Sequence, residues 1–261
     1  MLNTERLNIV SENTDLKNSK IAIIGIPFDS TVWSIPGQRL APNAIREHLL
    51  LQECENNLSE VYDDGNLNSI HGNAKKTIDL IESNLEEIFE KNNNIIPIHL
   101  GGEHTITLGV IKTLSKRYKD LQVLSFDAHF DLKDKQFGEK FGHSTVMRRI
   151  YEITKDIIFF GARTGSIDEI DFAKKMKTEI NPNKPTYISI DMDFFDPSQA
   201  PGVGDPESGG YTYQDFMELF KSLKLKKIIG VDIVEANPLI EKHITSHLAS
   251  KLLLQFIRVL K

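Results

Sequence analysis

The fold of this chain is decided by one stretch, Leu121-Gln122-Val123-Leu124-Ser125-Phe126-Asp127-Ala128-His129-Phe130-Asp131. Its first half is apolar on nearly every residue, which is typical of a parallel strand buried on both faces. Its second half places Asp127, His129 and Asp131 on alternate residues. Alternate side chains of an extended chain point the same way, so these three groups can converge where the strand ends.

Similar apolar runs recur along the chain and alternate with helical patterns. Strands are predicted over residues 21–26, 95–100, 121–126, 157–161, 186–190 and 227–231. Helices are predicted over 42–51, 75–91, 108–118, 168–177, 213–223 and 244–259, with a capping box at Ser166 and Glu169 and an N-cap at Thr212. This alternation predicts an α/β fold of three layers, α/β/α, with a mostly parallel sheet.

Composition and charge exclude several classes of protein. The chain of 261 residues has 31 Lys and Arg against 37 Asp and Glu, a formal net charge of −6, so we expect no nucleic-acid partner. No secretory signal and no apolar run of about 18 residues is found, which predicts a cytoplasmic protein without a membrane partner. Cys54 is the one cysteine, so disulfides within the chain and Cys-rich zinc sites are excluded. No linker divides the chain, and a single domain over residues 1–261 is predicted.

Two further motifs stand at the ends of predicted strands. Gly101-Gly102-Glu103-His104 follows one, and Asp191-Met192-Asp193 follows another. The carboxyl ends of parallel strands share one edge of a sheet, where ligands bind in open α/β folds. The aperiodic stretches 127–142 and 191–210 begin at the same edge, and loops of that length are usually functional.

These motifs predict a metal centre at the carboxyl edge of the sheet. Clustered carboxylates repel one another unless a cation neutralises them. Four aspartates and two histidines are too many ligands for one tetrahedral zinc, and they suit two divalent ions bridged by a water that becomes hydroxide near neutral pH. The mixture of oxygen and nitrogen ligands favours Mn²⁺, although Zn²⁺, Co²⁺ and Fe²⁺ remain open. The predicted ligands are His104, Asp127, His129, Asp131, Asp191 and Asp193.

With these motifs, the chain resembles the ureohydrolases, the family of arginase, agmatinase and formimidoylglutamase. The resemblance rests on the three motifs above, on Ser189 to Pro197 and on Pro201-Gly202-Val203-Gly204, and it covers nearly the whole chain. It implies an arginase-like fold, two Mn²⁺ ions per chain and a homotrimer or homohexamer. One ion would be held by His104, Asp127, Asp131 and Asp191, and the other by Asp127, His129, Asp191 and Asp193.

The resemblance also implies roles in catalysis. His143 matches a histidine that moves protons near the leaving amine, and a neutral imidazole suits that task at pH 7. Glu235 matches the glutamate that pairs with the planar guanidinium of the substrate. Asp131 would relay a proton to the departing amine. Asp205 replaces a threonine near the guanidinium, so it would add a carboxylate beside Glu235.

Three other residues are interpreted as structural. Trp33 is expected to be an ordinary packing residue rather than a wall of the substrate entrance. His99 is expected to be a hydrogen-bonded core histidine, because it lies inside an apolar strand. Asp232 follows the same strand as Glu235 and is expected to support the site rather than to react.

The resemblance implies hydrolysis of a guanidino substrate to urea and a primary amine, by attack of a hydroxide that bridges the metals. Agmatine is the expected substrate, because Lys133 stands where arginases carry an asparagine that helps to hold the substrate carboxylate. Lys133 could equally serve a carboxylate, as in guanidinobutyrate. Arginase, guanidinobutyrase and formimidoylglutamase activities therefore stay open, as does, more remotely, a single-zinc deacetylase of the same fold. A polyamine-binding protein without activity would be expected to lose ligands, and all six are present.

Overall fold

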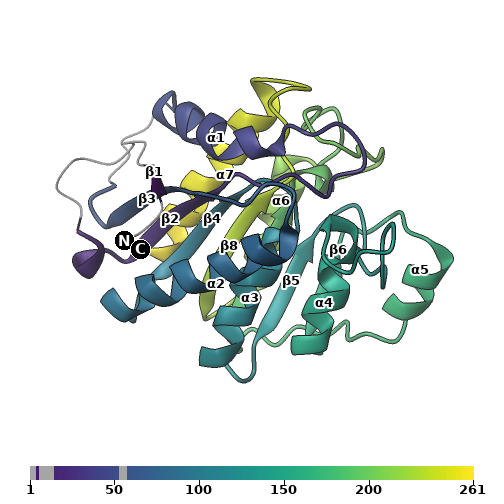
Figure 1. The fold of residues 1–261 in the computed structure, drawn as a ribbon, viewed down its shortest axis with the longest axis horizontal. Helices are drawn as coiled ribbons and strands as arrows, with labels where there is room; N and C mark the ends of the chain where they lie inside the picture. Colours follow the sequence, from purple (N-terminus) through teal and green to yellow (C-terminus); the bar gives the residue numbers. More distant parts are fainter. Residues whose placement is uncertain (1–3, 6–14, 53–57) are drawn as a thin grey trace.

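An eight-stranded sheet forms the centre of the computed structural model, which describes residues 4–5, 15–52 and 58–261 (Figure 1). The strand order is β1-β3-β2-β4-β8-β7-β5-β6, and every neighbouring pair is parallel except β1 and β3. The strands are β1 (Thr4–Glu5), β2 (Ile21–Ile26), β3 (Val61–Leu67), β4 (Ile96–Gly101), β5 (Gln122–Phe126), β6 (Ile157–Phe160), β7 (Thr186–Asp191) and β8 (Ile228–Val234).

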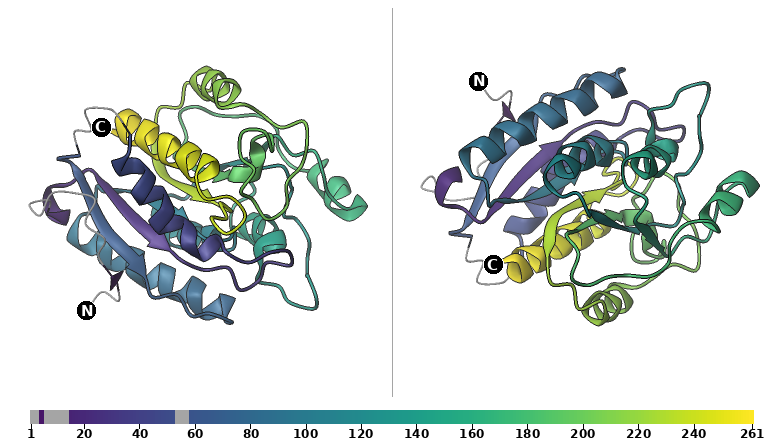
Figure 2. Two further views of the ribbon diagram at one scale, coloured as in Figure 1. Left: turned by 90° about the horizontal axis from the view of Figure 1, so that it is seen from above. Right: turned by 90° about the horizontal axis from the view of Figure 1, so that it is seen from below.

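Helices cover both faces of this sheet, as the two views of Figure 2 show. α1, α6 and α7 pack in one apolar core, and α2, α3 and α4 pack in the other. The predicted α/β fold with a mostly parallel sheet is therefore confirmed. The helices are α1 (Ala41–Leu50), α2 (Ala74–Lys91), α3 (Ile106–Arg117), α4 (Val146–Ile153), α5 (Ile167–Ala173), α6 (Tyr213–Ser222) and α7 (Ile244–Leu260).

All the predicted strands and helices are present, and most of their ends agree closely. The predicted helix over 168–177 ends early, at Ala173, and the predicted strand over 227–231 extends to Val234. Both expected caps are confirmed. The Ser166 side chain accepts a hydrogen bond from the Glu169 backbone, and the Thr212 side chain accepts one from the Asp215 backbone.

The structure contains three elements that no sequence pattern predicted: β1, β3 and α4. β3 carries Asp63, Asp64, Gly65 and Asn66, which are residue types that strands disfavour. Its polar groups are satisfied from α1, where the fully buried Arg46 donates from Nε and Nη2 to the Asp63 carboxylate at 2.9 and 2.8 Å. Pairing with β2 and this ion pair thus outweigh the local preference.

The sheet order explains how distant motifs meet. β4, β8, β7 and β5 are consecutive neighbours in the sheet, and all of them run parallel. Their carboxyl ends carry, in that order, the Gly-Gly-Glu-His motif, Glu235, the Asp191 motif and the Asp127 motif. The predicted convergence at one edge of the sheet is therefore confirmed.

His99 lies in β4 and is buried, as expected for a core histidine. Burial lowers its pKa to about 3, against a hydrogen bond with the Val231 backbone, so the ring is neutral at pH 7. Within the described ranges, no helix combines the length and the apolar character that a membrane span requires.

Candidate active site

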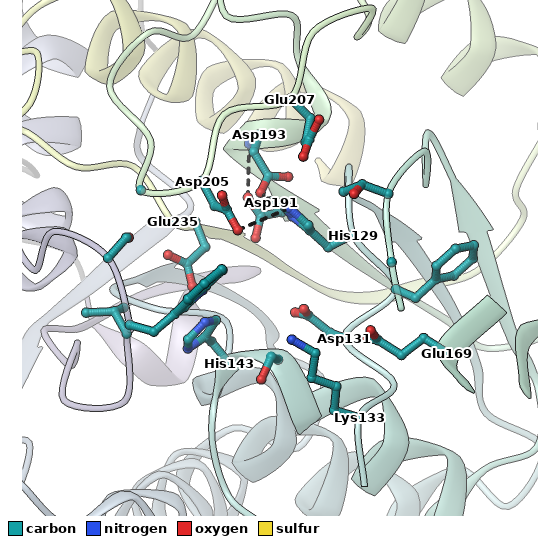
Figure 3. Close-up of a pocket in the computed structure, with 18 of the residues that line it drawn as sticks. His129, Asp131, Lys133, His143, Glu169, Asp191, Asp193, Asp205, Glu207 and Glu235 are labelled. Atoms are coloured by element: carbon teal, nitrogen blue, oxygen red, sulfur yellow. Dashed lines mark hydrogen bonds and ion pairs between the residues drawn. The ribbon is translucent and has the colours of Figure 1, made fainter. Parts of the chain in front are cut away.

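A cavity of about 270 Å³ opens at the carboxyl edge of the sheet (Figure 3). Segments after five different strands line it: the loop after β2, the loop after β5, the segment after β6 that leads into α5, the loop after β7 and the end of β8. Both long aperiodic stretches contribute, which agrees with the functional role predicted for them. Most of the predicted site residues line the cavity: His129, Asp131, His143, Asp191, Asp193, Asp205 and Glu235.

Five of the six predicted ligands meet in two groups that share Asp127, and all but the partly exposed His129 are buried. His104, Asp127 and Asp191 form the first group, and Asp127, His129 and Asp193 form the second. In each group, one potential ligand atom per residue lies within 4.8 Å of the others. Residues from β4, β5 and β7 have therefore come together as the motifs predicted.

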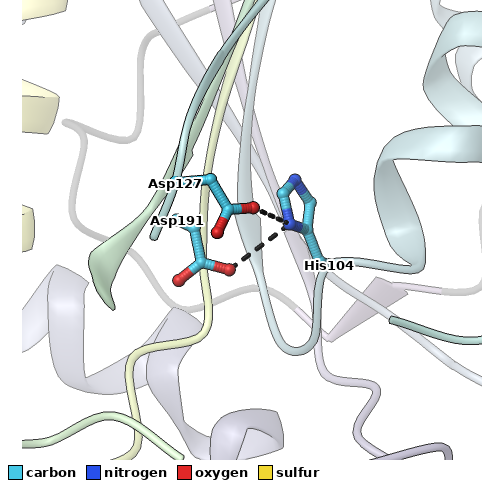
Figure 4. Close-up of side chains that lie close together, drawn as sticks. All are labelled: His104, Asp127 and Asp191. Carbon is cyan, nitrogen blue, oxygen red and sulfur yellow. Dashed lines mark ion pairs between the residues drawn. The ribbon is translucent and has the colours of Figure 1, made fainter. Parts of the chain in front are cut away.

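The first group centres on the ring nitrogen Nδ1 of His104 (Figure 4). This atom lies 3.1 Å from Asp127 Oδ2 and 3.3 Å from Asp191 Oδ2. Asp131 Oδ2 also lies 3.1 Å from it. Three carboxylates thus surround one imidazole nitrogen.

The second group centres on His129. Its Nδ1 lies 2.8 Å from Asp193 Oδ2 and 3.6 Å from Asp127 Oδ1. Its other nitrogen, Nε2, lies 3.4 Å from Asp205 Oδ2. Asp205 and Glu235 both line the cavity, but the ion-pair partner of Asp205 is His129.

The protein fixes the tautomer of His104. The Ser189 hydroxyl donates to Asp232 at 2.6 Å and lies 2.9 Å from His104 Nε2. Because the Ser189 proton is directed to Asp232, Ser189 accepts from Nε2–H, so Nδ1 is the ring nitrogen that faces the three carboxylates. Asp232 also accepts from Tyr187 Oη at 2.8 Å, which agrees with the supporting role expected for it.

The ring nitrogen of His104 and the carboxylates around it are ligands that suit a divalent cation. His104 Nδ1 and Asp127 Oδ2 are buried and lack a hydrogen-bond partner among the described residues. Burial opposes a charge on this ring, but Asp127, Asp131 and Asp191 raise the pKa of His104 well above its usual range, so the site favours positive charge at Nδ1. Metal-binding histidines are oriented by just such a hydrogen bond at their second nitrogen. The chemistry of the group thus supports the predicted metal centre.

The pKa values of the carboxylates also support a cation site. Burial and the charge of Asp127 raise the pKa of Asp131 to about 7. Burial and the charges of Asp193 and Asp127 raise the pKa of Asp191 well above its usual range. A cation bound among these groups would remove that repulsion and hold them ionised.

Glu235 is held by the turn that carries His104. Its Oε1 accepts from the His104 backbone N–H at 2.7 Å, and its own N–H donates to Gly102 O at 2.8 Å. Burial and the charge of Glu103 raise the pKa of Glu235 well above its usual range. Glu235 has a φ of 65° and Asp131 has a φ of 51°, so the backbone is strained at two of the predicted catalytic residues.

His143 lies at the start of a short 3₁₀ turn (His143–Thr145) and lines the cavity. Burial lowers the pKa of its imidazole to about 4, so the ring is neutral at pH 7. Its backbone N–H donates to Thr31 Oγ1 at 3.1 Å.

The interpretation of Trp33 as an ordinary packing residue is wrong. Trp33 lines the cavity and is 55% exposed. The ammonium of Lys133 lies 5.7 Å from the centre of its ring. The short polar segment around Trp33 has no periodicity, so no pattern indicated which way the side chain would point.

Two further acidic residues line the cavity, and the sequence predicted no role in the site for either of them. Glu207 belongs to the loop after β7, and its carboxylate makes no hydrogen bond or ion pair with the described residues. Glu169 was expected only as part of a cap. Besides that, its Oε1 accepts from the Leu132 backbone at 3.1 Å and so connects α5 to the loop that carries Asp131.

Several known proteins are similar to this chain over most of its length. A family model described as the arginase family matches residues 19–183 and 171–258. An agmatinase of Bacillus cereus is 31% identical over 88% of this chain and 87% of its own length. An N(1)-aminopropylagmatine ureohydrolase of Thermococcus kodakarensis is 32% identical over 88% of this chain and 87% of its own length. The crystal structure of agmatine ureohydrolase of Thermoplasma volcanium superposes with a TM-score of 0.79 and 30% identity, covering 95% of this chain and 92% of that one.

Proposed function

The chain belongs to the arginase family of metal-dependent hydrolases that act on linear amidines, and on this premise we propose that it hydrolyses agmatine to putrescine and urea. Membership of this family implies that the substrate is a guanidino compound. The proposal for agmatine rests on the charge of the cavity and on the similarity to agmatinases.

The observation that carries the proposal is an excess of carboxylates in the cavity. The four aspartates of the proposed metal centre balance two divalent cations. Glu169, Asp205, Glu207 and Glu235 also line the cavity, and they face only one lysine, Lys133, among the described lining residues. A cavity of this sign attracts cations, and agmatine carries two positive charges and no carboxylate.

We propose two Mn²⁺ ions per chain as the cofactors. His104, Asp127, Asp131 and Asp191 would hold one, and Asp127, His129, Asp191 and Asp193 would hold the other. When bound, such ions act as Lewis acids and lower the pKa of a water molecule toward neutrality.

The protein's own residues would then orient the substrate and move protons. The Glu235 carboxylate would bind the guanidinium and direct its central carbon toward the metal centre. As oxygen adds to that carbon, the bond to the alkyl-bearing nitrogen breaks. Asp131 would carry the proton to this nitrogen, and the neutral imidazole of His143 would exchange protons with solvent. Urea and a primary amine are the products.

Guanidinobutyrate is the second candidate substrate, and Lys133 is the observation that favours it. The Lys133 side chain lines the cavity, and its Nζ lies 3.2 Å from Gln136 Oε1. A lysine there can bind the carboxylate of a substrate. Lys133 therefore opposes the second cation of agmatine, and the excess of carboxylates opposes guanidinobutyrate.

The deciding experiment measures product release from agmatine, arginine, guanidinobutyrate and formimidoylglutamate in the presence of Mn²⁺. Urea marks the first three compounds and formamide marks the last. We expect agmatine to give the highest kcat/KM. A higher value for guanidinobutyrate would replace the agmatinase proposal with the second candidate.

We also propose that residues 1–261 form a single domain of a cytoplasmic protein, and that the chains assemble as a homotrimer or homohexamer, as the resemblance implies. A molar mass of three or six chains in light scattering is expected. A monomer at working concentration would contradict the proposed assembly.

A further inference from the structure

A network of hydrogen bonds joins the Gly-Gly-Glu-His turn to the segment that carries His143. Glu103 is fully buried in that turn, directly before His104. Its Oε2 accepts from the Thr31 backbone N–H at 2.7 Å. Its Oε1 accepts from the Thr31 hydroxyl and from the Thr105 hydroxyl, the latter at 2.5 Å.

The Thr31 hydroxyl can then take part in a further hydrogen bond only as the acceptor. Its proton is directed to Glu103, and a hydroxyl oxygen keeps lone pairs after it has donated. The His143 backbone N–H donates to this oxygen at 3.1 Å. A buried carboxylate therefore fixes a hydroxyl, and the hydroxyl fixes the backbone of His143.

The neighbouring residue confirms how closely the two segments approach. A Cβ atom built on Gly142 would lie 3.1 Å from Thr31 Oγ1, so a side chain there would crowd the contact. Burial lowers the pKa of the His143 ring, and a hydrogen bond with the Thr31 backbone opposes that shift. Thr31 does not line the main cavity, whereas His143 does.

We propose that Thr31 is a positioning residue, which sets the position of His143 in the cavity through its Glu103-anchored hydroxyl. This inference rests on the proposed function, in which His143 moves protons. The same turn then organises three parts of the site: it carries His104, its backbone holds Glu235, and Glu103 controls His143 through Thr31.

The test is a double-mutant cycle between Thr31→Val and His143→Ala, with urea release from the best guanidino substrate as the readout. We expect Thr31→Val to lower kcat by about tenfold with little change in KM, which is part of the roughly 10²–10⁴-fold that a positioned acid–base group contributes. In the His143→Ala background the same change should cost less than about twofold, because a residue that acts through His143 has nothing left to position.

Three further variants make the cycle specific. Thr31→Ser keeps the hydroxyl and should restore most of kcat. Thr31→Ala removes the hydroxyl with less crowding, and it replaces Thr31→Val if that variant does not fold. Thr105→Val removes another hydroxyl bonded to Glu103, one that lies 3.3 Å from Thr31 Oγ1 and makes no hydrogen bond with His143 among the described residues. Its effect should depend less on His143→Ala than the effect of Thr31→Val does.

The metal-to-chain ratio should be equal in all of these variants. Additive effects of Thr31→Val and His143→Ala, an unchanged kcat in Thr31→Val, or loss of metal from that variant would overturn the inference while the proposed function stands. If the parent protein releases urea from none of the guanidino substrates, the proposed function fails, and the role of Thr31 fails with it.

Discussion

Asp191 and His104 differ in how many metal ions they would bind. Asp191 would bridge both ions, and His104 would hold only one. We therefore expect Asp191→Asn to lower kcat at least about tenfold further than His104→Asn, a difference of about 1.4 kcal/mol in transition-state stabilisation. Urea release and metal analysis of both variants provide the measurement. A milder defect in Asp191→Asn, with equal metal content, would show that the bridging role is wrong.

Lys133 and Glu207 are the charges of the cavity that would act on the far end of a substrate. We expect agmatine to exceed arginine in kcat/KM by about tenfold, because arginine would bring a carboxylate into a cavity rich in carboxylates. Lys133→Ala should raise kcat/KM for agmatine by a few fold, and Glu207→Gln should lower it by about as much, since a pair of charges near a protein surface is worth about 1 kcal/mol.

Butylguanidine, which lacks the second charge, is the matched control substrate for both variants. Its kcat/KM should be nearly the same in the parent and in each variant. The opposite result for agmatine, together with a loss of guanidinobutyrate hydrolysis in Lys133→Ala, would show that Lys133 selects a carboxylate.

At the scale of elements, α5 links a helix cap to the site. Ser166 and Glu169 cap this helix, and Glu169 also accepts from Leu132 next to Asp131. Ser166→Ala should cost about 1 kcal/mol of unfolding free energy, as loss of a cap usually does, and lower the melting temperature by about 2–4 °C. It should also lower kcat/KM, because Glu169 then loses the Ser166 hydroxyl, one of the two groups of Ser166 that donate to its Oε2.

Thr212→Ala is the matched control, since Thr212 and Asp215 form the same kind of cap on α6 and do not line the cavity. Thermal unfolding and steady-state kinetics of both variants make the comparison. We expect equal losses of stability and a loss of activity only in Ser166→Ala. Equal activities would show that the cap of α5 serves stability alone.

The helices and strands show how much of the fold sequence patterns could predict. Apolar runs such as Val123-Leu124 and helical spacing such as Ile78, Ile81 and Leu85 gave the right elements, because each pattern reflects burial of that element alone. β3 was missed because its stability comes from Arg46 and from pairing with β2, which lie elsewhere in the sequence.

At the scale of the whole molecule, the motifs predicted which residues meet, and the order of the strands in the sheet determines which of them become neighbours. The sequence indicated that Asp127 and Asp191 follow strands, and their shared edge followed from parallel pairing. The placement of β8 between β4 and β7, which brings Glu235 beside His104, depends on the packing of the whole chain. The contact of Thr31 with His143 joins residues 112 positions apart, and no local pattern encodes it.

Metal removal should change the stability of the molecule as well as its activity. Without cations, buried carboxylates at the ends of β5 and β7 repel one another. We expect chelation to lower the melting temperature by about 5 °C or more and added Mn²⁺ to restore it, because ions that bind only the folded state stabilise it. Asp191→Asn should show a smaller response to Mn²⁺. An equal response in that variant would place the stabilising ions elsewhere.

The most direct test of the central claim is a titration of metal-free protein with Mn²⁺ in which bound metal and urea release from agmatine are measured on the same samples. The two buried groups of ligands predict that activity saturates at two ions per chain. Full activity with one ion per chain, or urea release that persists in the metal-free protein, would contradict the account.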